Sequence, residues 1–199
     1  MLPLVAAGGL VLALWQGRGR AAGLAPLLVA ALLWGRAERP DLLVSESGGL
    51  AGVLTEAGRG LSRPRGDGFA AGIWLENDGA GGTEQAIAAG RGVAAGTAHP
   101  LAGLRLLHVT GKRGLAAVTG CGGADLLVVN VIPEAPRPCL TLDPALLRRT
   151  GSVAGWATPA GLRLESAAAR AGKRLWTPHA GPPAELPALL APRRIAAHR

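Results

Sequence analysis

Two uncharged apolar runs open the chain, on either side of a short basic turn. Residues 2–15 and 21–35 contain no charged side chain, and QGRGR at 16–20 separates them. Each run is shorter than the roughly 20 apolar residues that a membrane span needs. A secretory signal fits poorly, because no basic residue precedes the first run and a second run follows at once. The pattern favours a transmembrane helical hairpin over residues 1–36, with a buried hairpin in a globular fold as the alternative.

Four side chains set the orientation that we expect for this hairpin. Arg18 and Arg20 lie in its turn, and basic turns stay on the cytoplasmic side of a membrane under the positive-inside rule. Trp15 and Trp34 close the two runs, where indole rings favour the membrane–water interface. We therefore expect the residues after 36 to lie on the far side of the membrane.

From Pro40 onward the pattern changes to short β-like runs separated by turns and short helices. Strands are expected at residues 41–45, 50–54, 59–62, 69–75, 104–111, 125–132, 139–143, 152–158 and 162–167. Short helices are expected at 83–90, 112–121 and 144–151. This mixture predicts an α+β domain of mixed or antiparallel strands over 37–178. A Pro/Arg-rich tail at 179–199 is expected to be irregular, with one helical turn near 184–191.

Five blocks of this domain carry a recognisable pattern. They are ERPDLLVSESGGLAGVLTEAGRGLS, GFAAGIWLENDG, ADLLVVNV, CLTLDPALLRRTGSVAGW and LRLESAAARAGKRLWTP. In order and spacing over residues 2–178, the chain resembles the C-terminal region of ComEC-type competence proteins in their alphaproteobacterial form. The preceding hairpin, with its RGR turn, resembles the last membrane segments of that family.

The resemblance implies part of an inner-membrane channel for DNA uptake, which passes single-stranded DNA into the cell during natural transformation. It also implies a metallo-β-lactamase-like domain in the periplasm, which agrees with the orientation set by the basic turn. The polytopic channel domain and the N-terminal soluble domain of that family are missing. We therefore expect a fragment or truncated member, whose partners are the membrane, single-stranded DNA and the remaining channel components.

A zinc hydrolase site of the metallo-β-lactamase type needs a HxHxDH cluster with further His and Asp ligands. This chain offers His99, His108, His179 and His198, and no two of them lie within a few residues of each other. We therefore expect a reduced, metal-free relative of that fold, with no catalytic residues and no cofactor. His108 lies in an apolar strand and is interpreted as a packed residue.

The acidic loop WLENDGAGGTEQ at 74–85 is the other candidate for a metal site. Its carboxylates, Glu76, Asp78 and Glu84, do not have the spacing of a calcium-binding loop. Asn, Asp and Gly tolerate the backbone angles of a tight turn, so NDG is a strong turn sequence. We interpret the loop as a strand end, a turn and the start of a helix that Thr83 caps.

The formal charge of +8 suggests a nucleic-acid or anionic-membrane partner. However, 19 of the 21 basic residues are Arg, which also fits GC-rich codon usage. The most distinct basic cluster is Arg170, Lys173 and Arg174, which is either a solvated face or a contact for DNA phosphates. We predict weak binding of single-stranded DNA at these three residues.

The two cysteines, Cys121 and Cys139, flank the apolar strand at 125–132. In a reducing cytosol they would remain buried thiols, whereas in an oxidising compartment cysteines on adjacent elements can pair. Since the resemblance places the domain in the periplasm, we predict a Cys121–Cys139 disulfide.

Three functions remain open at this point. The first is a non-catalytic C-terminal portion of a DNA-uptake channel that guides single-stranded DNA. The second is a hydrolase or nuclease-like relative of the metallo-β-lactamases that acts on incoming DNA, against which the scattered histidines argue. The third is a small membrane-anchored interaction protein.

Overall fold

A computed structural model describes residues 1–172 and 186–192 of the chain. These residues belong to two compact units, Met1–Arg39 and Pro40–Arg199, which we describe separately. The expected boundary after residue 36 thus lies three residues before the division in the structure. Residues 179–185 and 193–199 of the expected tail lie outside the described residues.

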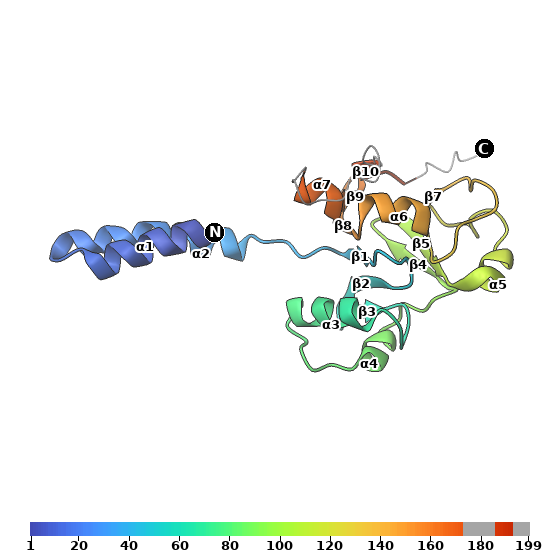
Figure 1. Cartoon of the computed structure of the whole chain (residues 1–199), viewed down its shortest axis with the longest axis horizontal. Coiled ribbons are helices and arrows are strands. Elements are labelled where there is room, and N and C mark those ends of the chain that lie inside the picture. Colours follow the sequence, from blue (N-terminus) through green and yellow to red (C-terminus); the bar gives the residue numbers. More distant parts are fainter. Residues whose placement is uncertain (173–185, 193–199) are drawn as a thin grey trace. The chain divides into compact units, whose positions relative to one another are not determined.

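The first unit consists of two apolar helices that pack side by side (Figure 1). Helix α1 (Leu2–Leu14) and helix α2 (Leu24–Gly35) are joined by a short 3₁₀ segment, η1 (Arg18–Gly23). Their backbones approach closely at two glycines, because a Cβ on Gly8 would lie 2.7 Å from the carbonyl oxygen of Gly23. Side chains on several faces of both helices remain exposed, including Leu2, Leu10, Leu14, Leu28 and Leu32.

The prediction of a transmembrane hairpin in the inner membrane, with the second unit in the periplasm, is wrong. Helices α1 and α2 have 13 and 12 residues. At a rise of about 1.5 Å per residue each is about 20 Å long or less, against a hydrocarbon core of about 30 Å. Helix α1 ends at Leu14; the backbone of the next residue, Trp15, is extended, and Gly17 has a φ of 78°. Among the described residues, no helix is both long and apolar enough to cross a membrane.

The second unit contains two β-sheets. The first has six antiparallel strands in the order β10 (Leu189–Leu190), β9 (Gly161–Ser166), β8 (Val153–Thr158), β1 (Leu42–Val44), β2 (Ala51–Thr55) and β3 (Gly58–Leu61). The second has four strands in the order β4 (Ala98–Leu101), β5 (Leu104–Val109), β6 (Leu126–Val129) and β7 (Leu140–Leu142). Strands β5, β6 and β7 are parallel, and β4 is antiparallel to β5. The predicted α+β class is therefore confirmed.

Helices α3 (Gly68–Asn77) and α4 (Gln85–Ala89) cover the outer side of the first sheet, and α5 (Gly111–Ala116) covers that of the second. Helices α6 (Pro144–Thr150) and α7 (Ala167–Ala171) contact each other, and α6 buries Leu147 in the core between the sheets. The inner faces of the two sheets share one core, to which Leu42 and Val44 contribute from β1 and Leu126 and Val128 from β6. A second cluster joins the first sheet to α3 and α4, and a third joins the second sheet to α5. The result is a helix–sheet–sheet–helix arrangement.

Residues 69–75, predicted as a strand, belong to helix α3. A short apolar run does not distinguish a buried strand from a helix by periodicity alone. In the structure Ala71, Trp74 and Leu75 are buried, whereas Phe69 and Ile73 are exposed. That is the three- and four-residue spacing of a helix with one buried face.

Two smaller expectations also differ from the structure. Leu189 and Leu190 pair with Leu162 and Arg163 as strand β10, so this part of the tail is not a helical turn. The reason is that β9 offers an open sheet edge to pair with, which local sequence does not reveal. The helix after the acidic loop has Glu84, rather than Thr83, at its N-cap.

A buried ion pair fastens α3 to the first sheet. Arg59 on β3 is fully buried, and its Nε donates a hydrogen bond of 2.6 Å to Asp78 Oδ2. Its Nη2 donates to Asp78 Oδ1 and to the carbonyl oxygen of Pro40, at 3.3 and 2.9 Å. Asp78 directly follows α3, so this one guanidinium connects the end of the helix, β3 and the start of the unit.

Replacing Asp78 with Ala should destabilise the protein strongly, because it leaves the Arg59 guanidinium buried without its carboxylate. We expect a loss of about 3 to 5 kcal/mol in the free energy of unfolding, measured by urea denaturation. Glu76→Ala is the matched control, because the Glu76 side chain is exposed near the end of the same helix. It should change stability by about 0.5 kcal/mol or less. Equal unfolding midpoints for the two variants would contradict the role given to the ion pair.

Candidate functional site

The turn between β1 and β2 is tied to the start of α3 by one carboxylate. Ser45 Oγ and Ser47 Oγ both donate hydrogen bonds to Asp67 Oδ2, at 2.7 and 2.5 Å. The two hydroxyls accept hydrogen bonds from the backbone N–H groups of Leu50 and Gly49. Asp67 itself has a left-handed backbone, with φ 49°. These contacts fix where α3 begins.

A pocket of about 740 Å³ lies beside this turn. We call it the Phe69 pocket. It is lined by the β1–β2 turn, by α3, and by α6 and the residues that follow α6. The lining residues include Ser47, Asp67, Phe69, Ile73, Trp74 and Arg148. Phe69 is 84 % exposed, and Ile73 follows one turn later on the same helix. The pocket therefore combines an unshielded aromatic ring with a small number of charged groups, as ligand pockets commonly do.

A smaller cleft of about 150 Å³ adjoins the Phe69 pocket and shares Trp74 and Ser152 with it. We call it the Trp156 cleft. Strands β1, β8 and β9 form its floor, and α7 contributes Arg170. Across β8 and β9, the Arg163 guanidinium lies 4.5 Å from the centre of the Trp156 ring, which is a cation–π contact.

Helices α6 and α7 carry three arginines. Arg148 and Arg149 lie in the last turn of α6, Arg170 lies in the last turn of α7, and the two helices are in contact. The Arg170 side chain is 72 % exposed and lies 3.7 Å from Glu165, so the ion pair is screened by water and weak. We call these three cations the arginine edge; Arg148 lines the Phe69 pocket and Arg170 lines the Trp156 cleft.

His108 lies behind the turn rather than in the pocket. Its side chain is 3 % exposed on β5, and Nε2 lies 3.1 Å from the carbonyl oxygen of Gly48. Nδ1 is buried with no hydrogen-bond partner among the described residues. Burial lowers the pKa of His108 to about 4, so the ring is neutral at pH 7. The imidazole thus links the second sheet to the β1–β2 turn of the first sheet. His108 is a packed residue, as its position in an apolar strand predicts.

Asp67 is the common acceptor of this cluster. Both serine hydroxyls donate to its Oδ2, and the His108 imidazole contacts a backbone carbonyl and not a hydroxyl. In the described part of the chain, no three His, Cys, Asp or Glu side chains come together as a metal site.

The acidic loop is dispersed in the structure. Asp78 is engaged by Arg59, while Glu76 and Glu84 are exposed at the end of α3 and the start of α4. His99 is half-buried on β4, and His179 and His198 lie outside the described residues. Of the three predicted DNA contacts, Arg170 belongs to the arginine edge, and Lys173 and Arg174 lie outside the described residues.

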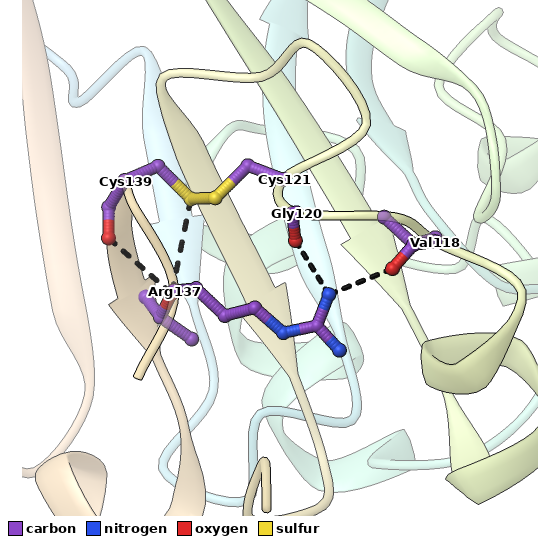
Figure 2. Close-up of a disulfide and its surroundings, with 6 residues drawn as sticks. Val118, Gly120, Cys121, Arg137 and Cys139 are labelled. Atoms are coloured by element: carbon purple, nitrogen blue, oxygen red, sulfur yellow. Dashed lines mark hydrogen bonds between the residues drawn. A yellow bond between two sulfur atoms is a disulfide. The ribbon is translucent and has the colours of Figure 1, made fainter. Parts of the chain in front are cut away.

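The structure joins Cys121 and Cys139 in a disulfide, with their Cα atoms 6.2 Å apart (Figure 2). The bond ties the loop after α5 to the start of β7, on either side of strand β6 in the sequence. Arg137 strengthens the same junction, because its Nη1 donates hydrogen bonds to the carbonyl oxygens of Val118 and Gly120 (Figure 2). A cavity of about 520 Å³ lies beside this loop, with Lys112 and Glu134 on its lining.

The residues of the Phe69 pocket were not identified from the sequence. The apolar run at 69–75 predicts a buried strand, which would hide Phe69, and Arg148 lies within a run that predicts only a short helix. One signal was available: Phe69 is the single phenylalanine of the chain, and Ile73 follows it at helical spacing. What brings Ser47 and Arg148 beside them is tertiary packing, which the sequence pattern does not show.

No family model, curated protein or solved structure matches this chain.

Removing the disulfide should destabilise the second unit. Closing a loop of 18 residues restricts the unfolded chain by about 3 kcal/mol in the chain-entropy model. We expect Cys121→Ser/Cys139→Ser to lower the free energy of unfolding by about this amount, measured by urea denaturation without reductant. Dithiothreitol should bring the wild type to the stability of the variant and leave the variant unchanged. A wild type insensitive to reductant would contradict a contribution from this bond.

The buried His108 should make stability depend on pH. Its pKa is about 4 in the folded protein and near 6.5 in the unfolded chain, so its contribution is complete above pH 6.5 and is lost as the pH falls toward 4. Between about pH 7.5 and 4.5 the wild type should lose about 2 to 3 kcal/mol more than His108→Gln, in which an amide can still donate to Gly48. The carboxylates titrate in both proteins, so their effect on stability cancels in the difference between wild type and variant. Parallel pH profiles of the urea midpoint would refute the assignment.

Proposed function

We propose that this chain is a non-catalytic C-terminal portion of a ComEC-type DNA-uptake protein and that it holds single-stranded DNA along the arginine edge. The five sequence blocks that resemble that family support the ancestry. The helix–sheet–sheet–helix arrangement is compatible with the reduced metallo-β-lactamase-like domain that the resemblance implies.

The observation that carries the proposal is the position of the arginines. Arg148 and Arg149 lie in the last turn of α6 and Arg170 in the last turn of α7, and these two helices are in contact. Beside them run the Phe69 pocket and the Trp156 cleft, which contain aromatic side chains. Cations that follow a phosphate backbone next to aromatic rings that stack on bases are the usual elements of a single-strand binding surface.

The non-catalytic part of the proposal rests on how the polar groups are used. Asp67 is occupied by two serine hydroxyls, Asp78 by Arg59, and His108 by a backbone carbonyl in an apolar interior. The contacts of Asp78 and His108 would have to be broken for those groups to bind a metal or activate water, and both serines engage Oδ2 of Asp67. Binding the phosphates of DNA requires none of these groups, because phosphate contacts are made by exposed cations.

The arginine edge should account for part of the salt dependence with which the protein binds single-stranded DNA. We expect Arg148→Ala/Arg149→Ala/Arg170→Ala to weaken binding of single-stranded oligonucleotides equally for every base composition. Because the variant no longer neutralises the phosphates that these arginines bind, the slope of log K against log salt should become shallower by about 2. Fluorescence anisotropy of labelled oligonucleotides of about 12 bases, between about 20 and 200 mM salt, gives both quantities.

The control removes three positive charges elsewhere on the second unit. Arg105→Ala/Lys112→Ala/Arg113→Ala changes residues on β5 and α5. It lowers the net charge equally but should leave the slope nearly unchanged. Equal effects of the two triple variants would show that only overall charge matters and would refute a defined edge. Lys173 and Arg174 remain candidates for the same strand and can be added to the first variant.

A further inference from the structure

We propose that the Phe69 pocket receives nucleobases of the bound strand and prefers bases that carry an exocyclic amino group, cytosine above thymine. The inference rests on the proposed function and deepens it, because it assigns the chemical preference of the site next to the arginine edge.

The aromatic ring is the first element of this pocket. Phe69 lies in the first turn of α3 with 84 % of its surface exposed, although the same helix buries Ala71, Trp74 and Leu75. The ring therefore contributes little to the core, and its face is open to a planar ligand. Ile73 extends the apolar surface by one helical turn. A base stacked on Phe69 would cover a ring that the fold leaves in water.

The carboxylates are the second element. Glu46 is exposed at the turn, Asp67 lies at the start of α3, and both line the pocket. The hydroxyls of Ser45 and Ser47 converge on a single oxygen of Asp67, Oδ2, and leave Oδ1 outside those two bonds. Carboxylate oxygens accept hydrogen bonds from the amino group of cytosine, whereas thymine presents a carbonyl oxygen at the same place. The pocket thus attracts one pyrimidine and repels the other.

Charge sets the direction in which the strand would lie. Phosphates are attracted by Arg148 and its neighbours on the α6 and α7 side, and are repelled by Glu46 and Asp67 on the turn. The backbone then follows the arginine edge and the bases point toward α3. The volume of about 740 Å³ is within the usual range for pockets that hold small organic ligands, roughly 300 to 1,000 Å³.

The test compares labelled oligo-dC and oligo-dT of equal length with the full chain at neutral pH and low salt, measured by fluorescence anisotropy. We expect oligo-dC to bind about fivefold more tightly, as a carboxylate contact to a base discriminates by this order or more. Glu46→Ala should bring the ratio of the two dissociation constants close to one, and Glu84→Ala, an exposed glutamate beyond the end of α3, should not. Phe69→Ala should weaken binding of both oligomers about tenfold, as loss of a stacking ring does.

Ile87→Ala is the control for Phe69→Ala, because Ile87 is 61 % exposed on α4 and does not line the pocket. Since Phe69 is equally outside the core, neither variant should alter folding, which the urea midpoint verifies. Equal affinity for oligo-dC and oligo-dT, or identical binding by the Phe69 and Ile87 variants, would overturn the base pocket while salt-dependent binding at the arginine edge persists. Absence of any salt-dependent binding would overturn the proposed function and the pocket together.

Discussion

The buried pair of Arg59 and Asp78 is the contact on which the candidate site depends. A guanidinium with no exposed surface strongly destabilises the fold unless its N–H groups have hydrogen-bond acceptors and its charge is paired. Here a carboxylate takes one side and a backbone carbonyl of the incoming chain takes the other. This arrangement fixes the end of α3 against the first sheet. It also makes the acidic loop, whose carboxylates first suggest a metal site, a structural junction.

Helix α3 is held at its other end by Asp67, and the two aspartates together explain why an apolar ring is exposed. With both ends fixed, the helix turns Ala71, Trp74 and Leu75 into the core and Phe69 and Ile73 toward solvent. The serines of the β1–β2 turn, whose carbonyl at Gly48 is also bound by His108, close one side of the pocket. Helix α6 closes the other side with Arg148. Contacts that stabilise the fold therefore also determine the composition of the pocket.

The order of elements along the chain shows which contacts join neighbouring segments and which join distant ones. Strands β1 to β3 come early and β8 to β10 late, yet they form one sheet, and the middle of the chain forms the other. Asp41 illustrates the distance involved, because its Oδ2 accepts a hydrogen bond from the backbone of Ala157 on β8. Pairing of β1 with β8 brings α6 and α7, and with them Arg148 and Arg170, next to a helix that begins at residue 68.

Local sequence patterns predict much of the secondary structure. Short runs and turn residues are enough to predict the strands of the β2–β3 and β8–β9 hairpins and the apolar strands β5 and β6. They also predict α6, which lies between a proline and a glycine. The sequence also determined that two apolar helices precede the domain and that Cys121 and Cys139 flank the strongest strand. The tertiary structure decided the rest. It made residues 69–75 a helix, because one face of this short apolar run packs against the first sheet. It also assembled the pocket from a turn and two helices far apart in sequence, since a site of this kind is formed by burial and pairing between distant segments.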